Sequence, residues 1–259
     1  MARPSSGLLD ATDPAPVAVR NAGGAARLLL LGDHAGRAIP RALGSLGLNA
    51  GDLDRHIAWD IGVDALGRTL SAALDAVFIA QRYSRLVIDC NRALGDPASI
   101  AESSDATPIP GNAGLTAGQR AARTSEIFSP YHQAIADELD RRQTAGRPTL
   151  LVALHSFTPV MAGDARPWRY GVLHRHDSAF SAAVLAALRA RHGDIVGDNQ
   201  PYAMDGTDFT IPHHADARGL DYLELEVRQD LLTTAAGVAE VAAEVGAVLA
   251  DPHLQGEGR

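Results

Sequence analysis

The sequence lacks most of the features that mark secreted, membrane-bound or nucleic-acid-binding proteins. Its single cysteine, Cys90, excludes an internal disulfide framework and fits a reducing compartment. No apolar run approaches membrane-spanning length, and the N-terminus lacks the apolar core of a signal peptide. A formal net charge of −8 leaves no basic stripe that would neutralise nucleic-acid phosphates. We therefore expect a cytoplasmic protein with no nucleic-acid or membrane partner.

Several common catalytic motifs are also missing. Neither GxxxxGK[ST] nor GxGxxG follows a predicted strand, so the phosphate-binding nucleotide folds lose most of their support. The GxSxG elbow of α/β serine hydrolases and the helical HExxH motif of zinc proteases are absent as well. Cys90 is a possible nucleophile, but a single cysteine at a strand end is more often a small buried apolar residue. An active site must therefore combine residues that are far apart in the sequence.

What is present is the alternation of strands and helices of an α/β protein. Residues 149–155 form an apolar and β-branched run that ends in a histidine, a pattern typical of a strand buried on both sheet faces. Further strands are predicted at residues 27–31, 77–81, 85–89, 168–174 and 222–227. Helices are predicted at 39–43, 63–74, 116–144 with a break near 129–130, 178–191 and 233–249. The sequence thus predicts three layers, with a central, mostly parallel mixed sheet and helices on both faces.

The length of 259 residues fits one large domain, because no internal segment resembles a linker. We expect a flexible N-terminal arm at residues 1–24, a single domain at 25–250 and a polar tail at 251–259. Residues 93–115 hold three prolines and three glycines among small polar residues. Loops of this length in compact domains are usually functional or disordered, so this segment is predicted to be a lid over the site.

Reactive side chains gather where the predicted strands end. His34 follows the first strand, His155 ends the central one, and Asn91 and Arg92 follow another. Ligands bind at the carboxyl ends of the strands in open α/β sheets. Either histidine alone is as easily a hydrogen-bonded core residue, and Asp60, before a predicted helix, is as easily an N-cap. Together, however, two neutral imidazoles and one carboxylate would make a zinc site with a water in the open position.

Six longer motifs occur along the chain: GDHAGRAIP (32–40), HIAWDIG (56–62), RYSRLVIDCNR (82–92), ALHSF (153–157), NQPY (199–202) and LEVRQDLL (225–232). In content and order they resemble the N-formylglutamate amidohydrolase family, which is similar in fold to the zinc carboxypeptidases and aspartoacylases. The resemblance implies hydrolysis of a small anionic N-acyl amino acid, such as N-formylglutamate, with one Zn²⁺ per chain. Asp33 stands where proline is common in the family, and residues 93–115 and 158–170 do not match it.

Carried over by position, the resemblance assigns roles to individual residues. The implied metal ligands are His34, Asp60 and His155, with Asp33 as the rival carboxylate. The implied catalytic residues are Glu226, as the general base, and Arg85, which would face the developing oxyanion. The implied substrate-binding residues are Asn91, Arg92 and His214, and a guanidinium suits a planar carboxylate.

Alternatives remain at two levels. Glu224 lies two residues before Glu226 on the same strand face and is either a partner of the base or a solvent-facing residue. For the whole protein, the alternatives are a zinc carboxypeptidase-like hydrolase of short peptides and a non-catalytic binding protein on the same fold. The presence of every expected ligand, base and arginine argues against the non-catalytic alternative.

Overall fold

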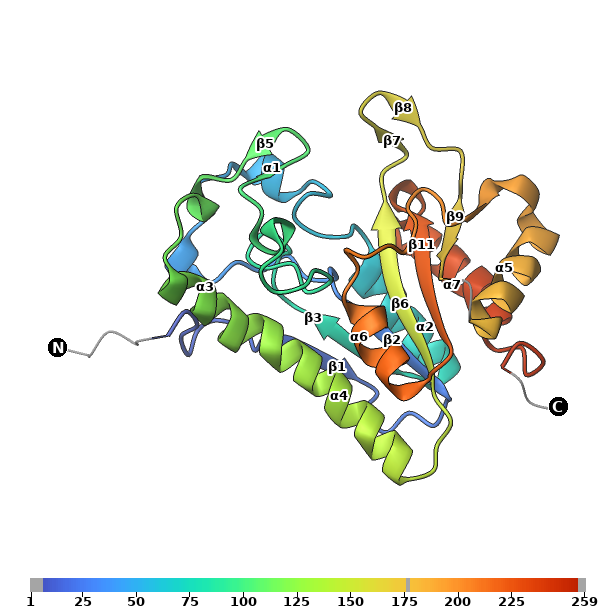
Figure 1. Ribbon diagram of the computed structural model, residues 1–259. Coiled ribbons are helices and arrows are strands. Elements are labelled where there is room, and N and C mark those ends of the chain that lie inside the picture. Colours follow the sequence, from blue (N-terminus) through green and yellow to red (C-terminus); the bar gives the residue numbers. More distant parts are fainter. Residues whose placement is uncertain (1–6, 176–177, 256–259) are drawn as a thin grey trace.

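The chain forms a seven-stranded mixed sheet with helices on both faces (Figure 1). The computed structural model describes residues 7–175 and 178–255, so the first six residues of the expected arm and the last four of the expected tail lie outside it. From edge to edge the strands are β1 (Val17–Arg20), β3 (Val77–Gln81), β2 (Leu28–Gly32), β6 (Leu150–Phe157), β11 (Tyr222–Arg228), β9 (Tyr170–Leu173) and β10 (Val196–Asp198). The four inner strands β3, β2, β6 and β11 are parallel, while β1 and β9 are antiparallel to their inner neighbours.

Side chains of the central strands alternate between two apolar cores. In β6 the even-numbered residues 150, 152 and 154 face one core, and the odd-numbered residues 151 and 153 face the other. Both faces of this strand are buried, which explains why its sequence is continuously apolar. In β11 Leu223 and Leu225 face the first core, so Glu224 and Glu226 point to the opposite side.

The first core lies under three helices, α2 (Val63–Leu74), α5 (Ala179–His192) and α7 (Ala235–Leu249). Side chains at the N-caps begin two of them: Ser178 accepts a hydrogen bond from the Ser181 amide, and Thr234 from the Gly237 amide. The predicted helices in these regions are confirmed, with ends that differ by one or two residues.

The second core lies under a π-helical turn (Thr124–Phe128), α4 (Ser129–Thr144) and the short α6 (Thr210–Ala215). The helix α3 (Ala117–Arg123) leads into the π turn, and α1 (Ala50–Leu53) is a single turn. The predicted interruption near residues 129–130 is present, but it is the π-helical turn that ends at Phe128 and not a break at Pro130. Pro130 lies in the first turn of α4, where its missing N–H is tolerated, and the wider π turn directly precedes it. With helices on both faces, the predicted three-layer α/β fold is confirmed.

One predicted strand is absent, and two edge strands of the sheet are not predicted from the sequence. Residues 85–89 form no strand, because the Val87 amide donates to the Ser84 carbonyl in a turn and the Asp89 amide donates to Ser99. This segment is apolar because it is buried in the second core. The edge strand β1 lies inside the segment that we expect to be an arm, so the sheet begins before residue 25, and β10 was not expected. Both are short edge strands with little local signal.

Two small hairpins stand beyond the carboxyl ends of the strands (Figure 1). One is formed by β4 (Ser103–Ser104) and β5 (Thr107–Pro108), within the predicted lid, and the other by β7 (Val160–Met161) and β8 (Asp164–Ala165). Across residues 7–175 and 178–255, no helix is long and apolar enough to cross a membrane.

Candidate metal centre and active site

A polar cavity of ≈ 340 Å³ opens at the carboxyl ends of β6 and β11. Its lining comes from segments far apart in the chain: the loop after β2, the loop before α2, the turn at residues 85–92, the β4–β5 hairpin and residues 202–208. Parallel strands deliver their carboxyl ends to one edge of the sheet, so these loops meet there. This is the place where the sequence predicts the site.

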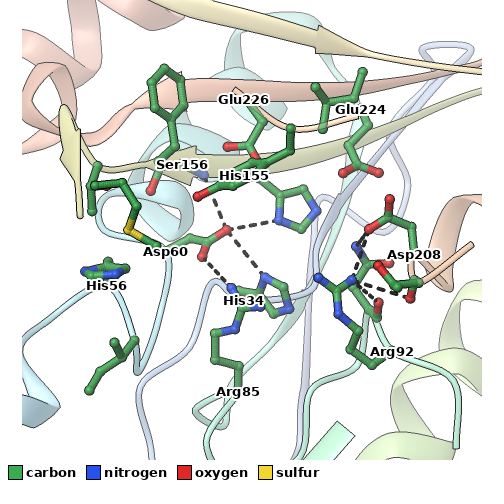
Figure 2. A pocket seen from close by; sticks show the side chains of 18 of the residues that line it. His34, His56, Asp60, Arg85, Arg92, His155, Ser156, Asp208, Glu224 and Glu226 are labelled. Atoms are coloured by element: carbon green, nitrogen blue, oxygen red, sulfur yellow. Dashed lines mark hydrogen bonds and ion pairs between the residues drawn. The ribbon is translucent and has the colours of Figure 1, made fainter. Parts of the chain in front are cut away.

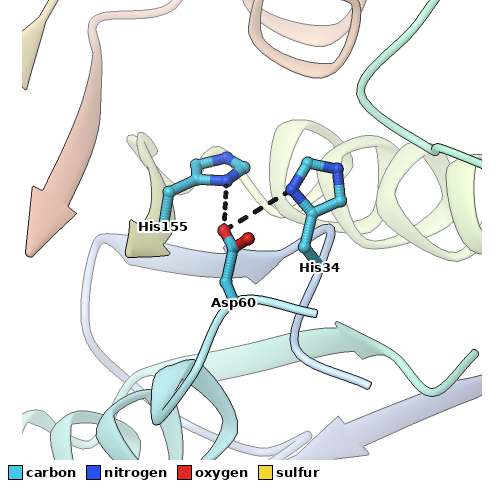
Figure 3. A group of neighbouring side chains, drawn as sticks. All are labelled: His34, Asp60 and His155. Atoms are coloured by element: carbon cyan, nitrogen blue, oxygen red, sulfur yellow. Dashed lines mark hydrogen bonds and ion pairs between the residues drawn. The ribbon is translucent and has the colours of Figure 1, made fainter. Parts of the chain in front are cut away.

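Three side chains at the floor of the cavity form one cluster (Figure 3). His34 follows β2, Asp60 precedes α2 and His155 lies on β6. One ligand atom from each lies within 4.8 Å of the others, and all three residues are buried. Asp60 Oδ2 is 3.5 Å from His34 Nδ1 and 3.0 Å from His155 Nδ1. The structure thus brings the three predicted ligands together.

The outer ring nitrogen of each histidine faces a second carboxylate. His34 Nε2 is hydrogen-bonded to Asp89 Oδ1 at 2.7 Å. His155 Nε2 is 3.3 Å from Asp33 Oδ2, which is an ion-pair distance without hydrogen-bond alignment. Carboxylates in these positions fix the orientation of metal-binding imidazoles and raise their basicity. Asp33, the rival ligand of the sequence analysis, therefore lies behind His155, whereas Asp60 lies between the two rings.

Asp33 is held in place by two hydroxyl groups. Its Oδ1 accepts hydrogen bonds from the Tyr131 hydroxyl at 2.7 Å and the Thr210 hydroxyl at 2.9 Å. Tyr131 is on α4 and Thr210 begins α6, so the two helices of the second face support the centre from behind. These supporting residues were not identified from the sequence.

Arg85 lies along the acidic side of the centre. One of its terminal nitrogens is 2.7 Å from Asp89 Oδ2 and the other is 3.5 Å from Asp60 Oδ1. Burial alone would lower the pKa of this guanidinium, but the two carboxylates raise it instead. Arg85 is thus a fixed positive charge beside the cluster, and it lines the cavity as predicted.

The two glutamates of β11 face the cavity from the sheet. Glu226 is paired in register with His155, and Glu224 with Ala153, two residues further from the strand end. Glu224 and Glu226 are 3% and 5% exposed, and Oε2 of each has no hydrogen-bond partner among the described residues. Burial raises the pKa of Glu226 to about 7 and that of Glu224 to about 8. Glu224 is therefore not the solvent-facing residue that the sequence left as one possibility.

The backbone at Gly171 and Gln200 packs closely beside Glu226. Gly171 on β9 is its partner on the other side of β11. A Cβ at Gly171 would lie 2.1 Å from the Gln200 carbonyl oxygen and 3.2 Å from Glu226 Cβ. Only glycine fits here, because residues 199–202 fold over this point of the sheet.

Asn91 and Arg92 are held by the segment before α6. Asn91 Oδ1 accepts hydrogen bonds from the backbone amides of Phe209 and Thr210, and its Nδ2 donates to Asp208. Arg92 Nη1 is 3.0 Å from Asp208 Oδ1. Both residues line the cavity, but the Asn91 side chain mainly fixes the turn at 208–210. Asp208 was missed in the sequence, where it is one acidic residue in a polar loop.

His214 lies behind the cavity. Its Nε2 is 3.1 Å from His132 Nδ1, and His132 Nε2 is hydrogen-bonded to the Cys90 carbonyl. Burial lowers the pKa of His214 to about 3, so the ring is neutral. Among the residues that the structure describes, the cavity lining does not include His214. This position argues against the predicted contact with substrate.

The cluster fits a divalent transition-metal ion. Its donors are two imidazoles and a carboxylate, the set that zinc and related ions bind in catalytic sites. Nδ1 of His34 is buried without a hydrogen-bond partner, while its Nε2 is bound to a carboxylate. A ring held in this way presents Nδ1 to an ion. The fold and the cluster together define an α/β protein with a candidate metal centre at the strand ends.

The comparisons with known proteins agree with this description. The family model for N-formylglutamate amidohydrolase matches residues 26–233, and the chain belongs to this family. It is therefore a hydrolase that acts on amide bonds, and the resemblance inferred from the motifs is confirmed.

Two solved structures are similar over most of the chain. A gene product from Agrobacterium tumefaciens is 37% identical, with 93% of this chain and 98% of that chain covered and a TM-score of 0.89. An N-formylglutamate amidohydrolase from Ralstonia eutropha JMP134 is 20% identical, with 92% and 96% covered and a TM-score of 0.70, which shows the common fold. No functionally curated protein matches the sequence.

Proposed function

We propose that this protein hydrolyses the amide bond of a small N-acyl amino acid, such as N-formylglutamate, with one Zn²⁺ per chain bound by His34, Asp60 and His155. The observation that carries the proposal is the position of Glu226. This buried carboxylate lies beside His155 in the register of β6 and β11, at the edge of the three-residue cluster. A general base is needed at this place in metal-assisted amide hydrolysis.

The ion would lower the pKa of a coordinated water and polarise the acyl carbonyl. Glu226 would accept the proton of the attacking water and deliver it to the leaving nitrogen. A pKa of about 7 suits both halves of this task, because the group is neither a strong acid nor permanently protonated near neutral pH. No other described carboxylate of the cavity lies opposite His155 in the sheet register.

The two arginines of the cavity take separate roles. Arg85 is fixed by Asp60 and Asp89 beside the cluster, where its charge would stabilise the oxyanion that develops on the acyl oxygen. Arg92 is 23% exposed in its side chain and would bind the α-carboxylate of the substrate. Asn91 would keep Arg92 and the 208–210 turn in place, in line with its hydrogen bonds.

We also propose that the protein works in the cytoplasm. Cys90 is a free, buried thiol, and burial raises its pKa well above the usual value, so it is poorly suited to be a nucleophile. A free thiol in a metal-dependent enzyme fits a reducing compartment.

The test compares Glu226→Gln with Glu240→Gln, an exposed glutamate on α7 that serves as the matched control. Each variant is purified without added metal, and zinc content and hydrolysis of N-formylglutamate, other N-formyl amino acids and short peptides are measured. Glu226→Gln is expected to keep one zinc per chain and lose about 10²- to 10⁴-fold in kcat. Glu240→Gln is expected to match the parent. Near-parental turnover by metal-loaded Glu226→Gln would remove Glu226 as the base, and cleavage of peptides alone would favour the carboxypeptidase-like alternative.

A further inference from the structure

Carboxyl groups outnumber guanidinium groups in the lining of the cavity. Its described lining includes six carboxylates and two guanidinium groups: Asp60, Asp105, Asp205, Asp208, Glu224 and Glu226, with Arg85 and Arg92. Both guanidinium groups are already paired with carboxylates. A second carboxylate of a substrate would therefore have to compete with the carboxylates that these arginines already hold.

Glu224 is the carboxylate that the proposed reaction leaves unused. It lies two residues before Glu226 on the same face of β11, about 6.6 Å along the strand. Its Oε2 is buried, has no hydrogen-bond partner among residues 7–175 and 178–255, and belongs to the cavity lining. Figure 2 shows Glu224 to the side of His155, with its carboxylate directed toward Asp208. No ion pair of the described chain involves Glu224.

A buried carboxylate without a partner is costly unless a ligand supplies one. Asp208 is a second carboxylate near Glu224, and the repulsion between them adds to burial in raising the pKa of Glu224. Arg92 pairs with Asp208 through one nitrogen, and the charge of His155 opposes the rise of the Glu224 pKa. No cationic side chain among the described residues is paired directly with Glu224. A cationic group brought between them would restore the ionised form of Glu224 and form charge-assisted hydrogen bonds.

We infer that Glu224, together with Asp208, forms a subsite for a cationic group on the amine side of the substrate. The inference rests on the proposed function, and it narrows the substrate class to N-acyl derivatives of amino acids with a basic side chain. Arg92 would bind the α-carboxylate, Glu226 would serve the scissile amide, and the side-chain ammonium would reach Glu224 deeper along β11.

The experiment uses metal-loaded protein and three matched substrates: Nα-formyl-lysine, Nα-formyl-norleucine, which lacks only the ammonium group, and N-formylglutamate. We expect kcat/KM for the lysine derivative to exceed that for the norleucine derivative by about 10- to 100-fold, the range for a hydrogen bond to a charged group. Glu224→Gln should abolish this preference and leave the norleucine derivative within a few-fold of the parent. Glu240→Gln should change neither value. Binding of free lysine and free norleucine, measured by calorimetry, gives a readout that does not depend on turnover.

Each outcome decides a different point. Equal kcat/KM for the lysine and norleucine derivatives in the parent protein, or a preference for N-formylglutamate, would overturn the cationic subsite and leave the proposed function standing. An equal loss on all three substrates in Glu224→Gln would make Glu224 a catalytic group instead. If no N-formyl amino acid is hydrolysed but lysine binds more tightly than norleucine, the proposed function falls and the subsite stands. The parental comparison decides the question even if the Glu224→Gln variant fails to fold.

Discussion

The two histidines of the centre have the same arrangement but different surroundings. Each directs Nδ1 toward Asp60 and Nε2 toward a second carboxylate, Asp89 for His34 and Asp33 for His155. The sequence gives no hint of this pairing, because the two outer carboxylates come from different loops. The similarity shows that the fold supports both rings in one way, from behind.

The difference lies in what holds the two outer carboxylates. Asp89 is paired with the guanidinium of Arg85, whereas Asp33 accepts hydrogen bonds from neutral hydroxyls. The Arg85 guanidinium offsets part of the negative charge of Asp89. That charge would otherwise stabilise the protonated form of His34. Although burial favours the neutral ring, Asp33 and Asp60 hold the pKa of His155 well above its usual value, while nearby Arg85 limits the rise of the pKa of His34. The pKa of His155 is therefore raised further than that of His34, and His155 attracts a proton more strongly.

The largest effect should come from removing either ring. We expect His34→Ala and His155→Ala to lose stoichiometric zinc and hydrolysis together, because two remaining donors hold zinc poorly. Zinc analysis and a hydrolysis assay measure both, with His253→Ala, an exposed histidine, as the control. Full metal occupancy in either variant would take that histidine out of the centre.

The next effect separates the ligand carboxylate from the supporting ones. Asp60→Asn should lower zinc affinity more than Asp33→Asn or Asp89→Asn, each of which should cost about 10- to 100-fold. Asp89→Asn should also lower the melting temperature more than Asp33→Asn, because it leaves the partly buried charge of Arg85 with one partner fewer. Competition with a chelator gives the affinities. A larger loss of affinity in Asp33→Asn than in Asp60→Asn would reverse their roles.

The charge on His155 predicts a pH dependence. Its folded-state pKa is raised above the ordinary value of 6.5, so its contribution to stability is fully present below pH 6.5 and is lost as pH rises through the folded pKa. The melting temperature of the metal-free protein should therefore fall from pH 6.5 toward alkaline pH, and zinc affinity should rise over the same range as the ring loses its proton. A pH-independent melting temperature of the metal-free protein would show that His155 is neutral.

The smallest effect concerns the hydroxyls behind Asp33. Tyr131→Phe removes the hydrogen bond to Asp33 Oδ1 and should cost about 1.5 to 3 kcal/mol of stability, as expected for a bond to a charged group. The matched control is Tyr83→Phe, whose hydroxyl donates to the uncharged Pro14 carbonyl and should cost about 1 kcal/mol. Denaturant unfolding of both variants measures the difference. Equal losses of unfolding free energy in the two variants would mean that the hydrogen bond from Tyr131 to Asp33 is no stronger than one to an uncharged acceptor.

The features of the fold that can be predicted from the sequence are those that depend on local sequence pattern. The central strands and α2 are predictable because long apolar runs and helical periodicity are strong signals. His34 and His155 stand out because they follow or end such strands, whereas the choice of Asp60 rests on the family resemblance. The apolar run at 85–89 misled the prediction, since burial in a turn and burial in a strand leave the same composition. Periodicity does not say where backbone hydrogen bonds go.

The parts that could not be predicted depend on contacts between distant segments. Tyr131 and Thr210 are 98 and 177 residues from Asp33, and neither residue type marks a metal centre. The family resemblance implies that Asn91 binds substrate, yet its side-chain oxygen accepts hydrogen bonds from the turn before α6. Only the packing of α4 and α6 against the sheet shows these roles.

The two sides of the cavity differ in how freely they can be redesigned. On the sheet side Gly171 permits no larger residue, so that wall is fixed by the scaffold. On the other side Asp105 sits at the tip of the β4–β5 hairpin, whose two strands pair only with each other among the described residues. Lengthening that hairpin breaks no bond of the central sheet, and each doubling of loop length costs only about 0.6 kcal/mol. New substrate preferences are therefore best engineered from the hairpin, with the catalytic floor left untouched.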